Sequence, residues 1–386
     1  MTVPPLTVLI SPDKFKGSLT AAEVAAALAD GFAAADSPVA VRSIQAPVAD
    51  GGEGTVQAAV SAGFVRHRAT VLGPTGEDVD AEFAYNPDTA TAVVELATAS
   101  GLDLLPGGVL APLTATCHGT GQLIGEALDL GATTIILGVG GSANTDGGTG
   151  LLTGLGAKLL DAAGNELPYG GAALAELASV DFTDFDSRVE HVNFVLAADV
   201  DNPLLGERGA PAIFGPQKGA SEEDVATLDA ALANLVEQLA AARPDKDIRG
   251  AAEAPGAGAA GGAGYMAMAI FGAERRRGID VVIDFVGLKE KIKDANLVIV
   301  GEGSLDHQSL LGKAPVGVAD LAHERNIPVV AVAGRCLLTE EQIADAGFSK
   351  IYALADREPD PKKSMANAAA LLKGVAAEIL SDHSKD

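Results

Sequence analysis

Residues 6–23 read LTVLISPDKFKGSLTAAE and decide the fold class. The apolar run Leu6–Ile10 is continuous rather than alternating, which is typical of a strand buried on both faces of a parallel sheet. A polar loop follows this run, and Thr20 with Glu23 three residues later forms the capping-box signature of a helix start. A strand, a loop and a helix in this order predict the first unit of an α/β fold.

The same alternation recurs along the chain. Five further apolar runs are predicted strands: Thr134–Leu137, Phe194–Ala197, Val281–Phe285, Leu297–Val300 and Val329–Val332. Five segments have helical patterns: Ala21–Ala34, Gly121–Leu130, Glu222–Arg243, Val316–Arg325 and Met365–Ser381. We therefore expect a three-layer α/β architecture, in which ligands bind at the carboxyl ends of the strands.

Residues 65–98 interrupt this alternation. Short Thr/Val/Phe segments are broken by GPTGED and NPDT, which suggests an antiparallel, meander-like patch. A chain of 386 residues is long enough for two domains. The sequence thus predicts that a second domain begins near residue 65 and that simple alternation resumes after about residue 280.

Composition excludes several classes of function. The formal net charge of −25 disfavours binding to nucleic acid or to an anionic membrane. Cys117 and Cys336 lie far apart without a CxxC partner, and the six histidines show no HxH or HExxH spacing, so no disulfide framework or zinc site is predicted. Residues 254–273 carry no charge but are too rich in Gly and Ala for a membrane span, and the N-terminal segment lacks signal-peptide features. These features predict a cytoplasmic protein.

Two polar loops lie near the N-terminus. The first, Ser11–Ser18, places two lysines and an aspartate between a strand and a helix, which is typical of an anion site. The second, Asp50–Thr55, has a carboxylate on each side of a diglycine, whereas a helix start needs only one capping residue. Its carboxylates are suited to hold Mg²⁺ or to accept a hydroxyl proton. The simpler interpretations are a solvated turn and an N-cap.

The third loop, GVGGSANTDGG at residues 138–148, imitates a dinucleotide-binding fingerprint. It follows a predicted strand, but its second diglycine leaves a long loop where the fingerprint requires an immediate helix. A nest of backbone amides that binds phosphate fits this loop better than an NAD site.

The fourth and fifth loops carry different chemistry. Residues 198–219 contain Asp199, Asp201 and the side-chain amide of Asn202. These groups are suited to bind a metal ion through their oxygens or to act as a base with its partner. The simpler interpretation is a polar turn. Residues 256–264, GAGAAGGAG, offer only backbone, and close helix packing explains them as well as phosphate contact does.

The sixth loop runs from Gly301 to Pro315 and follows a predicted strand. Strand, glycine loop and helix are the arrangement that binds nucleotide phosphates. No GxxxxGK[ST] occurs in the chain, which excludes a P-loop. His307 beside Asp306 is interpreted as a surface or supporting group rather than a catalytic base.

Together the six loops resemble the bacterial glycerate kinase family of the single-chain, non-P-loop type. The matching stretches extend from residue 10 to residue 319: ISPDKFKGSLTA, PVADGGEGT, GVGGSANTDGG, ADVDNPLLGERGAPAIFGPQKGA, GAGAAGG and GEGSLDHQSLLGKAPVGVA. The chain departs from the family pattern at Lys14, at Ala198 and in the order Asn144-Thr145. Lys14 affects how anionic substrates are steered rather than which reaction occurs.

The resemblance implies ATP-dependent phosphorylation of D-glycerate with Mg²⁺, commonly at the 2-hydroxyl, with the 3-hydroxyl also possible. It also implies a discontinuous flavodoxin-like domain, residues 1–65 and 280–386, interrupted by a mixed α/β domain, residues 66–279. The active site is then expected in the cleft between the two domains.

Residue type and loop context suggest individual roles, which the resemblance does not fix. Lys16 and Lys218 are expected to neutralise the charges of the glycerate carboxylate and of the transferring phosphoryl group. Asp199 is the predicted base for the attacking hydroxyl, with Asp50 second. Further predicted substrate-binding residues are Asp13, Lys14, Ser18, Asn202 and Arg208. The predicted metal ligands are Glu53, Asp201 and Asp306, and the predicted ATP-binding residues are Gly140, Gly141, Ser142, Gly301, Glu302, Gly303 and Lys313.

Two alternatives remain open from the sequence. The fingerprint-like loop at residues 138–143 motivates an NAD-dependent hydroxy-acid dehydrogenase. A non-catalytic acidic binding protein is the other alternative, and the spread of carboxylates and lysines over four loops argues against it.

Overall fold

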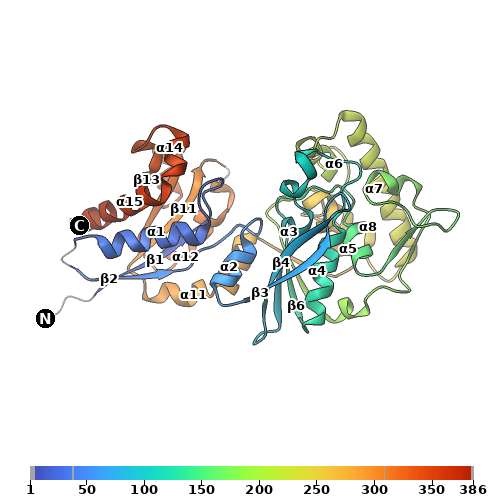
Figure 1. Ribbon diagram of the computed structural model, residues 1–386, viewed down its shortest axis with the longest axis horizontal. Coiled ribbons are helices and arrows are strands. Elements are labelled where there is room, and N and C mark those ends of the chain that lie inside the picture. Colours follow the sequence, from blue (N-terminus) through green and yellow to red (C-terminus); the bar gives the residue numbers. More distant parts are fainter. Residues whose placement is uncertain (1–4, 37–38, 308, 384–386) are drawn as a thin grey trace. The chain divides into compact units, whose positions relative to one another are not determined.

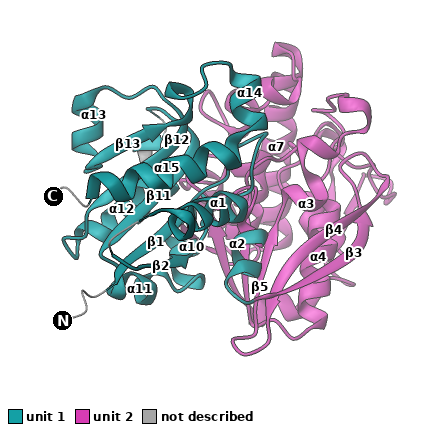
Figure 2. Cartoon of the chain, turned by 60° about the vertical axis from the view of Figure 1, so that its left-hand side comes forward, with its two compact units in different colours: residues 1–50, 57–63, 278–386 teal, residues 51–56, 64–277 magenta. Residues whose placement is uncertain are grey.

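The computed structural model describes residues 5–36, 39–307 and 309–383, so Gln308 of the sixth loop lies outside the described residues (Figure 1). The chain forms two compact units, coloured separately in Figure 2. Unit 1 comprises Met1–Asp50, Gln57–Gly63 and Gly278–Asp386, and unit 2 comprises Gly51–Val56 and Phe64–Arg277. None of the helices within the described ranges is long and apolar enough to cross a membrane.

Unit 1 is built on a five-stranded sheet in the order β13-β12-β11-β1-β2, with every neighbouring pair parallel. Its strands are β1 (Leu6–Pro12), β2 (Val41–Gln45), β11 (Leu297–Leu305), β12 (Val329–Cys336) and β13 (Lys350–Ala353). The central strands are buried on both faces, as the continuous apolar runs predicted.

Helices cover both faces of this sheet. The helices of unit 1 are α1 (Ala21–Ala34), α10 (Gly278–Phe285), α11 (Leu288–Lys291), α12 (Ala314–His323), α13 (Glu340–Asp345), α14 (Pro361–Ala366) and α15 (Ala368–His383), and α2 (Thr55–Ser61) begins within unit 2. Val8 and Ile10 pack with α1 and α15, whereas Leu9 between them packs with α10 and α12. This alternation along β1 gives unit 1 its helix–sheet–helix layers.

Local signals in the sequence set the first helix. The Thr20 side chain accepts from the backbone of Glu23 and the Glu23 side chain accepts from the backbone of Thr20, which confirms the predicted capping box.

Two predicted elements of unit 1 are wrong. The segment Val281–Phe285, predicted as a strand, belongs to the helix α10. Ile279, Val282 and Ile283 of α10, with Val286 just after it, pack in one core cluster at helical spacing. A short apolar run does not by itself distinguish a buried strand from a buried helix. The predicted helix Met365–Ser381 is two helices, because helical structure is interrupted at Asn367 between α14 and α15.

Unit 2 contains a six-stranded mixed sheet in the order β10-β9-β6-β5-β4-β3. The strands β3, β4 and β5 form an antiparallel meander, as predicted for residues 65–98, while β5, β6, β9 and β10 run parallel. A two-stranded sheet, β7 with β8, completes the unit. The strands are β3 (Val65–Leu72), β4 (Asp78–Asn86), β5 (Thr91–Glu95), β6 (Thr134–Gly138), β7 (Lys158–Leu160), β8 (Ser179–Asp181), β9 (Asn193–Ala197) and β10 (Glu274–Arg276).

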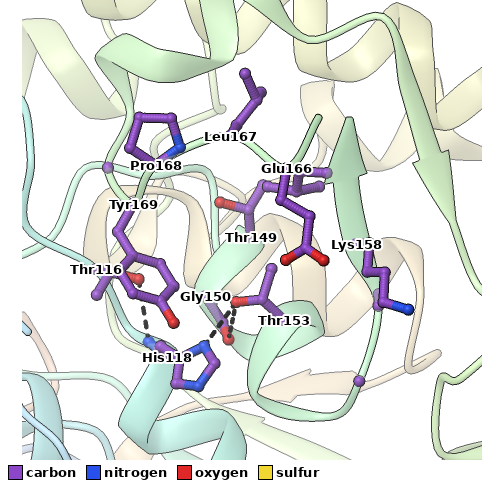
Figure 3. A pocket seen from close by; sticks show the side chains of 14 residues that line it. Thr116, His118, Thr149, Gly150, Thr153, Lys158, Glu166, Leu167, Pro168 and Tyr169 are labelled. Carbon is purple, nitrogen blue, oxygen red and sulfur yellow. Dashed lines mark hydrogen bonds between the residues drawn. The ribbon is translucent and has the colours of Figure 1, made fainter. Parts of the chain in front are cut away.

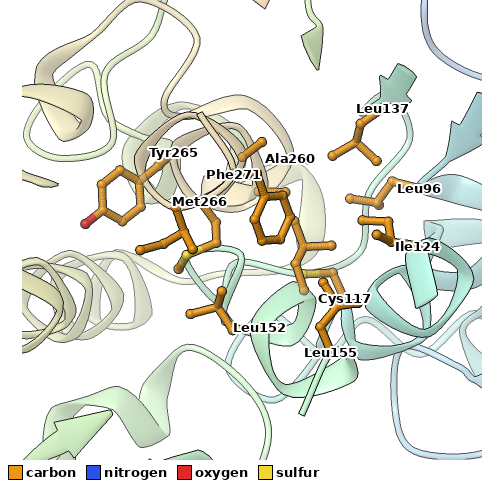
Figure 4. Packing of buried hydrophobic residues seen from close by; sticks show 14 of the residues in the cluster. Leu96, Cys117, Ile124, Leu137, Leu152, Leu155, Ala260, Tyr265, Met266 and Phe271 are labelled. Carbon is orange, nitrogen blue, oxygen red and sulfur yellow. The ribbon is translucent and has the colours of Figure 1, made fainter. Parts of the chain in front are cut away.

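One large apolar cluster forms the core of unit 2. Figure 4 shows its side chains, among them Ile124 from α4, Leu152 from α5 and Met266 from α9. The helices of the unit are α3 (Ala97–Ser100), α4 (His118–Asp129), α5 (Thr149–Gly154), α6 (Ala210–Phe214), α7 (Glu222–Ala242), α8 (Ile248–Glu253) and α9 (Ala263–Ala269). No tryptophan occurs in the chain, so the core is aliphatic apart from a few Phe and Tyr rings.

The contact between α1 and α15 depends on a glycine and gives a direct test of the layer packing. A Cβ at Gly31 would lie 2.6 Å from the Lys373 carbonyl oxygen and 2.7 Å from the Ala376 Cβ. We expect Gly31→Ala to lower the free energy of unfolding by about 2 kcal/mol despite the higher helix propensity of alanine.

The matched control is Gly374→Ala in α15, where the nearest atom to a new Cβ is the flexible end of Arg357 at 3.2 Å. This variant should gain about 0.5–1 kcal/mol. Urea unfolding of both variants measures the difference. Equal effects of the same sign would contradict the described packing of α1 on α15.

Candidate active site

The predicted site residues fall into two groups, one in each unit. In unit 1 they gather at the carboxyl ends of the adjacent parallel strands β1 and β11, where Pro12 is paired with Gly301. The backbone N–H of Asp13 donates to the Gly301 carbonyl at 2.8 Å, so the first loop leaves the sheet beside the residues that follow Gly301. This edge of a parallel sheet is where α/β proteins bind ligands.

Asp13 is the buried carboxylate of this group, with 8% of its surface exposed. Burial raises the pKa of Asp13 to about 7, against the opposing effect of the Lys14 ammonium 3.8 Å away. The charges of Asp50 and Glu302 add to the rise. Sequence reasoning placed Asp13, Lys14 and Asp50 in the site, and the structure brings these residues into one electrostatic group.

Glu302 is the second carboxylate whose pKa burial raises to about 7. A hydrogen bond with Ser309 and the charge of Lys313 oppose this rise, and Asp306 and Asp50 add to it. Within the described residues, the Glu302 Oε1 atom is buried without a hydrogen-bond partner. An unsatisfied buried carboxylate oxygen is suited to meet a cation or a donor.

The sixth loop begins later than predicted. Gly301, Glu302 and Gly303 lie inside β11, which continues to Leu305, and their backbones pair with β12. A Cβ at Gly301 would lie 2.6 Å from the Val332 carbonyl oxygen, so the glycine is required by strand packing. The prediction that residues 301–303 form a loop is therefore wrong, because these residues belong to a strand. Lys313 is the residue that precedes α12 and acts on Glu302 by its charge.

The first loop folds into a tight turn. Phe15 and Leu19 form an isolated bridge, and Phe15 is buried, which leaves Lys16 exposed on the turn between them. The Ser18 hydroxyl donates to the Met365 carbonyl at 2.7 Å, so this predicted substrate-binding group ties the turn to α14.

In unit 2 the second and third loops pack backbone against backbone. A Cβ at Gly138 would lie 2.5 Å from the Gly51 carbonyl oxygen, and one at Gly140 would lie 2.7 Å from the Gly52 Cα. Sequence reasoning missed the carboxylate of Glu95, which is 4% exposed and accepts from the backbone N–H of Gly54 at 3.1 Å. Glu95 also accepts from the Val56 N–H at 3.2 Å and so fixes the loop that carries Glu53, an exposed residue.

Asp146 is the other carboxylate that sequence reasoning did not single out, although it lies within the third loop. It is fully buried and accepts from the backbone N–H groups of Cys117 (3.0 Å), Gly148 (3.0 Å) and Gly150 (3.2 Å). The Asn144 side-chain amide donates to it at 2.7 Å. A charged acceptor with several donors offsets the cost of burying the charge.

Lys218 is buried beside this network, with 2% of its surface exposed. Its ammonium donates to the Ser142 Oγ at 2.8 Å and to the Asn144 carbonyl oxygen at 2.5 Å. Burial lowers the pKa of Lys218 to about 8, with the charge of Asp146 opposing. The structure thus joins Lys218 to Ser142, two residues that the sequence placed in separate substrate and nucleotide roles.

The third loop does not open a dinucleotide site. Ten residues, 139–148, separate the last residue of β6 from the first residue of α5. A Cβ at Gly261 would lie 2.1 Å from the Asn144 carbonyl oxygen, and one at Gly262 would lie 2.5 Å from the Gly147 Cα. Gly261 and Gly262 of the fifth loop are therefore accounted for by packing against the third loop.

The fourth loop follows β9. Asp199 is exposed, and Asp201 pairs with Arg275 at 2.6 Å. The Asn202 amide donates to the Arg208 carbonyl at 2.8 Å, so these two predicted substrate-binding residues stabilise the turn itself. Across the described ranges, no three His, Cys, Asp or Glu side chains are grouped as a metal site. Of the predicted ligands, Glu53 and Asp201 lie in unit 2 and Asp306 lies in unit 1, and their role stays a prediction.

Comparisons with known proteins agree with this architecture. The model of the glycerate kinase family matches residues 8–384. The chain is 43% identical to glycerate 2-kinase of Escherichia coli (strain K12) over 380 residues, 97% of this chain and 98% of that protein. It is 41% identical to glycerate kinase of Bacillus subtilis (strain 168) over 375 residues, 97% of each chain.

A crystal structure of a Salmonella typhimurium LT2 protein assigned as glycerate kinase 2 superposes with a TM-score of 0.82. That protein is 39% identical, and the match covers 98% of this chain and 100% of the other.

This chain belongs to the glycerate kinase family. Members of the family are kinases, which confirms the resemblance drawn from the six loops and favours a phosphotransferase over the dehydrogenase alternative. A kinase family implies ATP as the phosphate donor.

The network around Asp146 predicts a large effect on stability. Asp146→Asn keeps the shape of the side chain but removes the charge and turns one acceptor into a donor that faces backbone N–H groups. We expect the free energy of unfolding to fall by about 3 kcal/mol. Asp161→Asn is the matched control, since Asp161 also accepts two backbone N–H bonds, from Ala163 and Asn165 at 2.8 Å each, but does so near solvent. It should cost clearly less, because water can replace the lost donors at this exposed position. Equal losses in chemical unfolding would contradict the central role of Asp146.

Burial of Lys218 predicts a pH dependence of stability. Its pKa is about 8 in the folded protein and about 10.5 in the unfolded chain, so between these values the unfolded state binds more protons. The free energy of unfolding contributed by Lys218 should therefore rise with pH across this window, by about 3 kcal/mol in total. Urea unfolding of the wild type and of Lys218→Met from about pH 7.5 to about pH 10 measures the difference. If the two curves stay parallel, the lysine titrates as an ordinary surface group.

Proposed function

We propose that this protein transfers the γ-phosphoryl group of ATP to D-glycerate, with 2-phosphoglycerate as the product. The observation that carries the proposal is the full-length similarity, at 43% identity, to a relative named glycerate 2-kinase. In the reaction a bond forms between the glycerate 2-oxygen and the γ-phosphorus. The bond from that phosphorus to the β,γ-bridging oxygen breaks, ADP leaves and the hydroxyl proton passes to a base.

We propose that the two units correspond to the domains expected from the sequence, residues 1–65 with 280–386 and residues 66–279, although residues 51–56 belong to unit 2. Each unit offers a part of the required chemistry. Unit 1 offers the carboxylates of Asp13, just after β1, and of Glu302, within β11, with Lys14, Lys16 and Lys313 nearby in the chain. Unit 2 offers the Gly140–Ser142 segment, held by Lys218, and the exposed Asp199.

Asp199 remains the proposed base, and Asp13 is the alternative that its surroundings favour. A general base works best with a pKa near the operating pH, and burial raises the pKa of Asp13 to about 7. Asp50, the second candidate from the sequence, would then act through its charge on Asp13. Lys16 is exposed and suited to meet the glycerate carboxylate or the phosphoryl group, whereas Lys218 acts by holding Ser142 and Asn144.

We propose that Mg²⁺ accompanies ATP. In proteins Mg²⁺ commonly takes one or two carboxylates and completes its shell with phosphates and water, so a ready-made cluster of three carboxylates is not required. The buried Glu302 Oε1 fits contact with this cation, with Asp306 as its neighbour in charge. Mg²⁺ would supply charge neutralisation of the transferring phosphoryl group. Asp201, paired with Arg275, is less available than Glu302.

We also propose a cytoplasmic location, where ATP is abundant. Both cysteines, Cys117 and Cys336, are free, as expected in a reducing compartment. Fractionation of cells that express the protein tests this point, and recovery in an extracytoplasmic fraction would contradict it.

The test of the reaction is a coupled assay with D-glycerate, ATP and Mg²⁺, with the product identified by ¹H and ³¹P NMR. We expect ADP and 2-phosphoglycerate in equal amounts. Formation of 3-phosphoglycerate would move the proposal to the other hydroxyl, and binding without ADP release would refute the kinase proposal.

The same assay separates the two bases. If Asp199 is the base, Asp199→Asn should lower kcat by about 100-fold or more while the protein stays folded by circular dichroism. Near-wild-type turnover of Asp199→Asn together with a similar loss in Asp13→Asn would reassign the base to Asp13. Asp181→Asn, a change at an exposed turn of unit 2, is the matched control and should leave kcat unchanged.

A further inference from the structure

Unit 2 contains a pocket of about 420 Å³ that none of the predicted site residues lines (Figure 3). Its walls come from the start of α4, from α5, from β7 and from residues 166–170, which follow β7. The volume suits a small organic molecule. What this molecule can be follows from the donors and acceptors in the walls.

The threonine hydroxyls of the pocket have their protons committed elsewhere. Thr149 Oγ1 donates to the Asp146 carbonyl at 2.8 Å, Thr153 Oγ1 donates to the Gly150 carbonyl at 3.2 Å, and Thr116 Oγ1 donates to the Asp146 carboxylate at 3.3 Å. A hydroxyl has one proton and two lone pairs. Thr116 Oγ1 also accepts from the His118 backbone N–H at 3.2 Å and keeps one lone pair. Toward a ligand, these three oxygens can therefore act only as acceptors.

His118 is an acceptor as well. Its Nδ1 lies 2.8 Å from Thr153 Oγ1, and since the Thr153 proton goes to Gly150, the hydrogen of this bond belongs to Nδ1. Burial lowers the pKa of His118 and favours the neutral ring, although the charge of Asp146 opposes this effect. In the neutral ring with a protonated Nδ1, Nε2 carries a lone pair.

The charges of the pocket favour a cation. Lys158 is neutralised by Asp184, whose carboxylate lies 2.6 Å from its ammonium. Glu166 is an exposed carboxylate in the wall, and Figure 3 shows its carboxylate pointing toward the side of the pocket that holds Thr153. The net charge of −25 for the whole chain acts in the same direction.

Tyr169 adds an aromatic wall. Its ring lies 5.0 Å from the His118 ring, tilted by 56°, and the residue is 45% exposed. Burial raises the pKa of the Tyr169 hydroxyl, and the charge of Glu166 adds to this rise. An aromatic ring close to a carboxylate is a common partner of ammonium groups.

We infer that this pocket binds a small organic ammonium compound, with the ammonium group at Glu166 and Tyr169 and its N–H donors toward the threonine and histidine acceptors. Phosphates and carboxylates are disfavoured because Glu166 repels an anion and the threonine and histidine groups offer it no donor. The inference concerns binding alone and does not depend on phosphoryl transfer by this protein.

The tyrosines give a direct readout. The chain has four tyrosines and no tryptophan, and the other three, Tyr85, Tyr265 and Tyr352, are at most 9% exposed. In protein labelled with 3-fluorotyrosine, ¹⁹F NMR should show four signals, of which Tyr169→Phe removes one and so assigns it. Titration with spermidine at about 150 mM salt, where general charge attraction is screened, should shift the Tyr169 signal saturably and leave the other three in place.

Two variants and two further probes make the test specific. Glu166→Gln should weaken spermidine binding about tenfold, because it removes a charge-assisted hydrogen bond. Glu176→Gln removes the same charge from an exposed residue outside the pocket and should bind spermidine like the wild type. Inorganic phosphate and sorbitol should leave the Tyr169 signal unmoved.

Three results would overturn the inference. They are no shift of the Tyr169 signal up to about 5 mM spermidine, a shift by phosphate or sorbitol as large as that by spermidine, or equal affinities in the two glutamine variants. The three buried tyrosines report in the same spectra that each variant is folded.

Discussion

The burial of the Asp146 carboxylate is the constraint on which the candidate site of unit 2 depends. A charge removed from water has to be met by donors, and here the donors are backbone N–H groups on two separate segments and the amide of Asn144. The start of α4 and the start of α5 therefore both donate to the two carboxylate oxygens of Asp146. Lys218 extends the network to Ser142 from a third segment. Loops that would otherwise be long and mobile become one rigid framework.

The carboxylates of unit 1 differ from Asp146 in their surroundings. Burial raises the pKa of Asp13 and of Glu302, and one Glu302 oxygen has no hydrogen-bond partner among the described residues. Incomplete satisfaction of this kind costs stability and is typical of positions kept for function. Among the described residues, unit 2 thus surrounds its buried carboxylate with donors, whereas unit 1 leaves a carboxylate oxygen without a hydrogen-bond partner.

The sequence predicted the regular parts of the fold well, because their signals are local. A few consecutive residues are enough to recognise the capping box of Thr20 and Glu23, the continuous apolar strands and the antiparallel meander. The segment Val281–Phe285 failed because a short apolar run is compatible with both a helix and a strand.

The site was predicted less completely, since burial and pairing depend on segments far apart in the chain. Glu95 and Asp146 looked like ordinary polar residues, and only their burial beside remote N–H groups shows their role. An acidic residue that ends an apolar strand, as Glu95 does, was the available signal. Arg275 was missed for the same reason, because its partner Asp201 lies 74 residues away.

The backbone contacts among the glycine-rich loops have a consequence for how such a chain can change over time. Any mutation of Gly138, Gly140, Gly261 or Gly262 adds at least a Cβ atom where another backbone already lies within 2.1–2.7 Å. Steric exclusion alone therefore prevents substitution of these four glycines, whatever the loops bind. Two proteins could therefore share these motifs, letter for letter, and still differ in their ligands. Divergence in specificity would then be found in the side chains between the glycines.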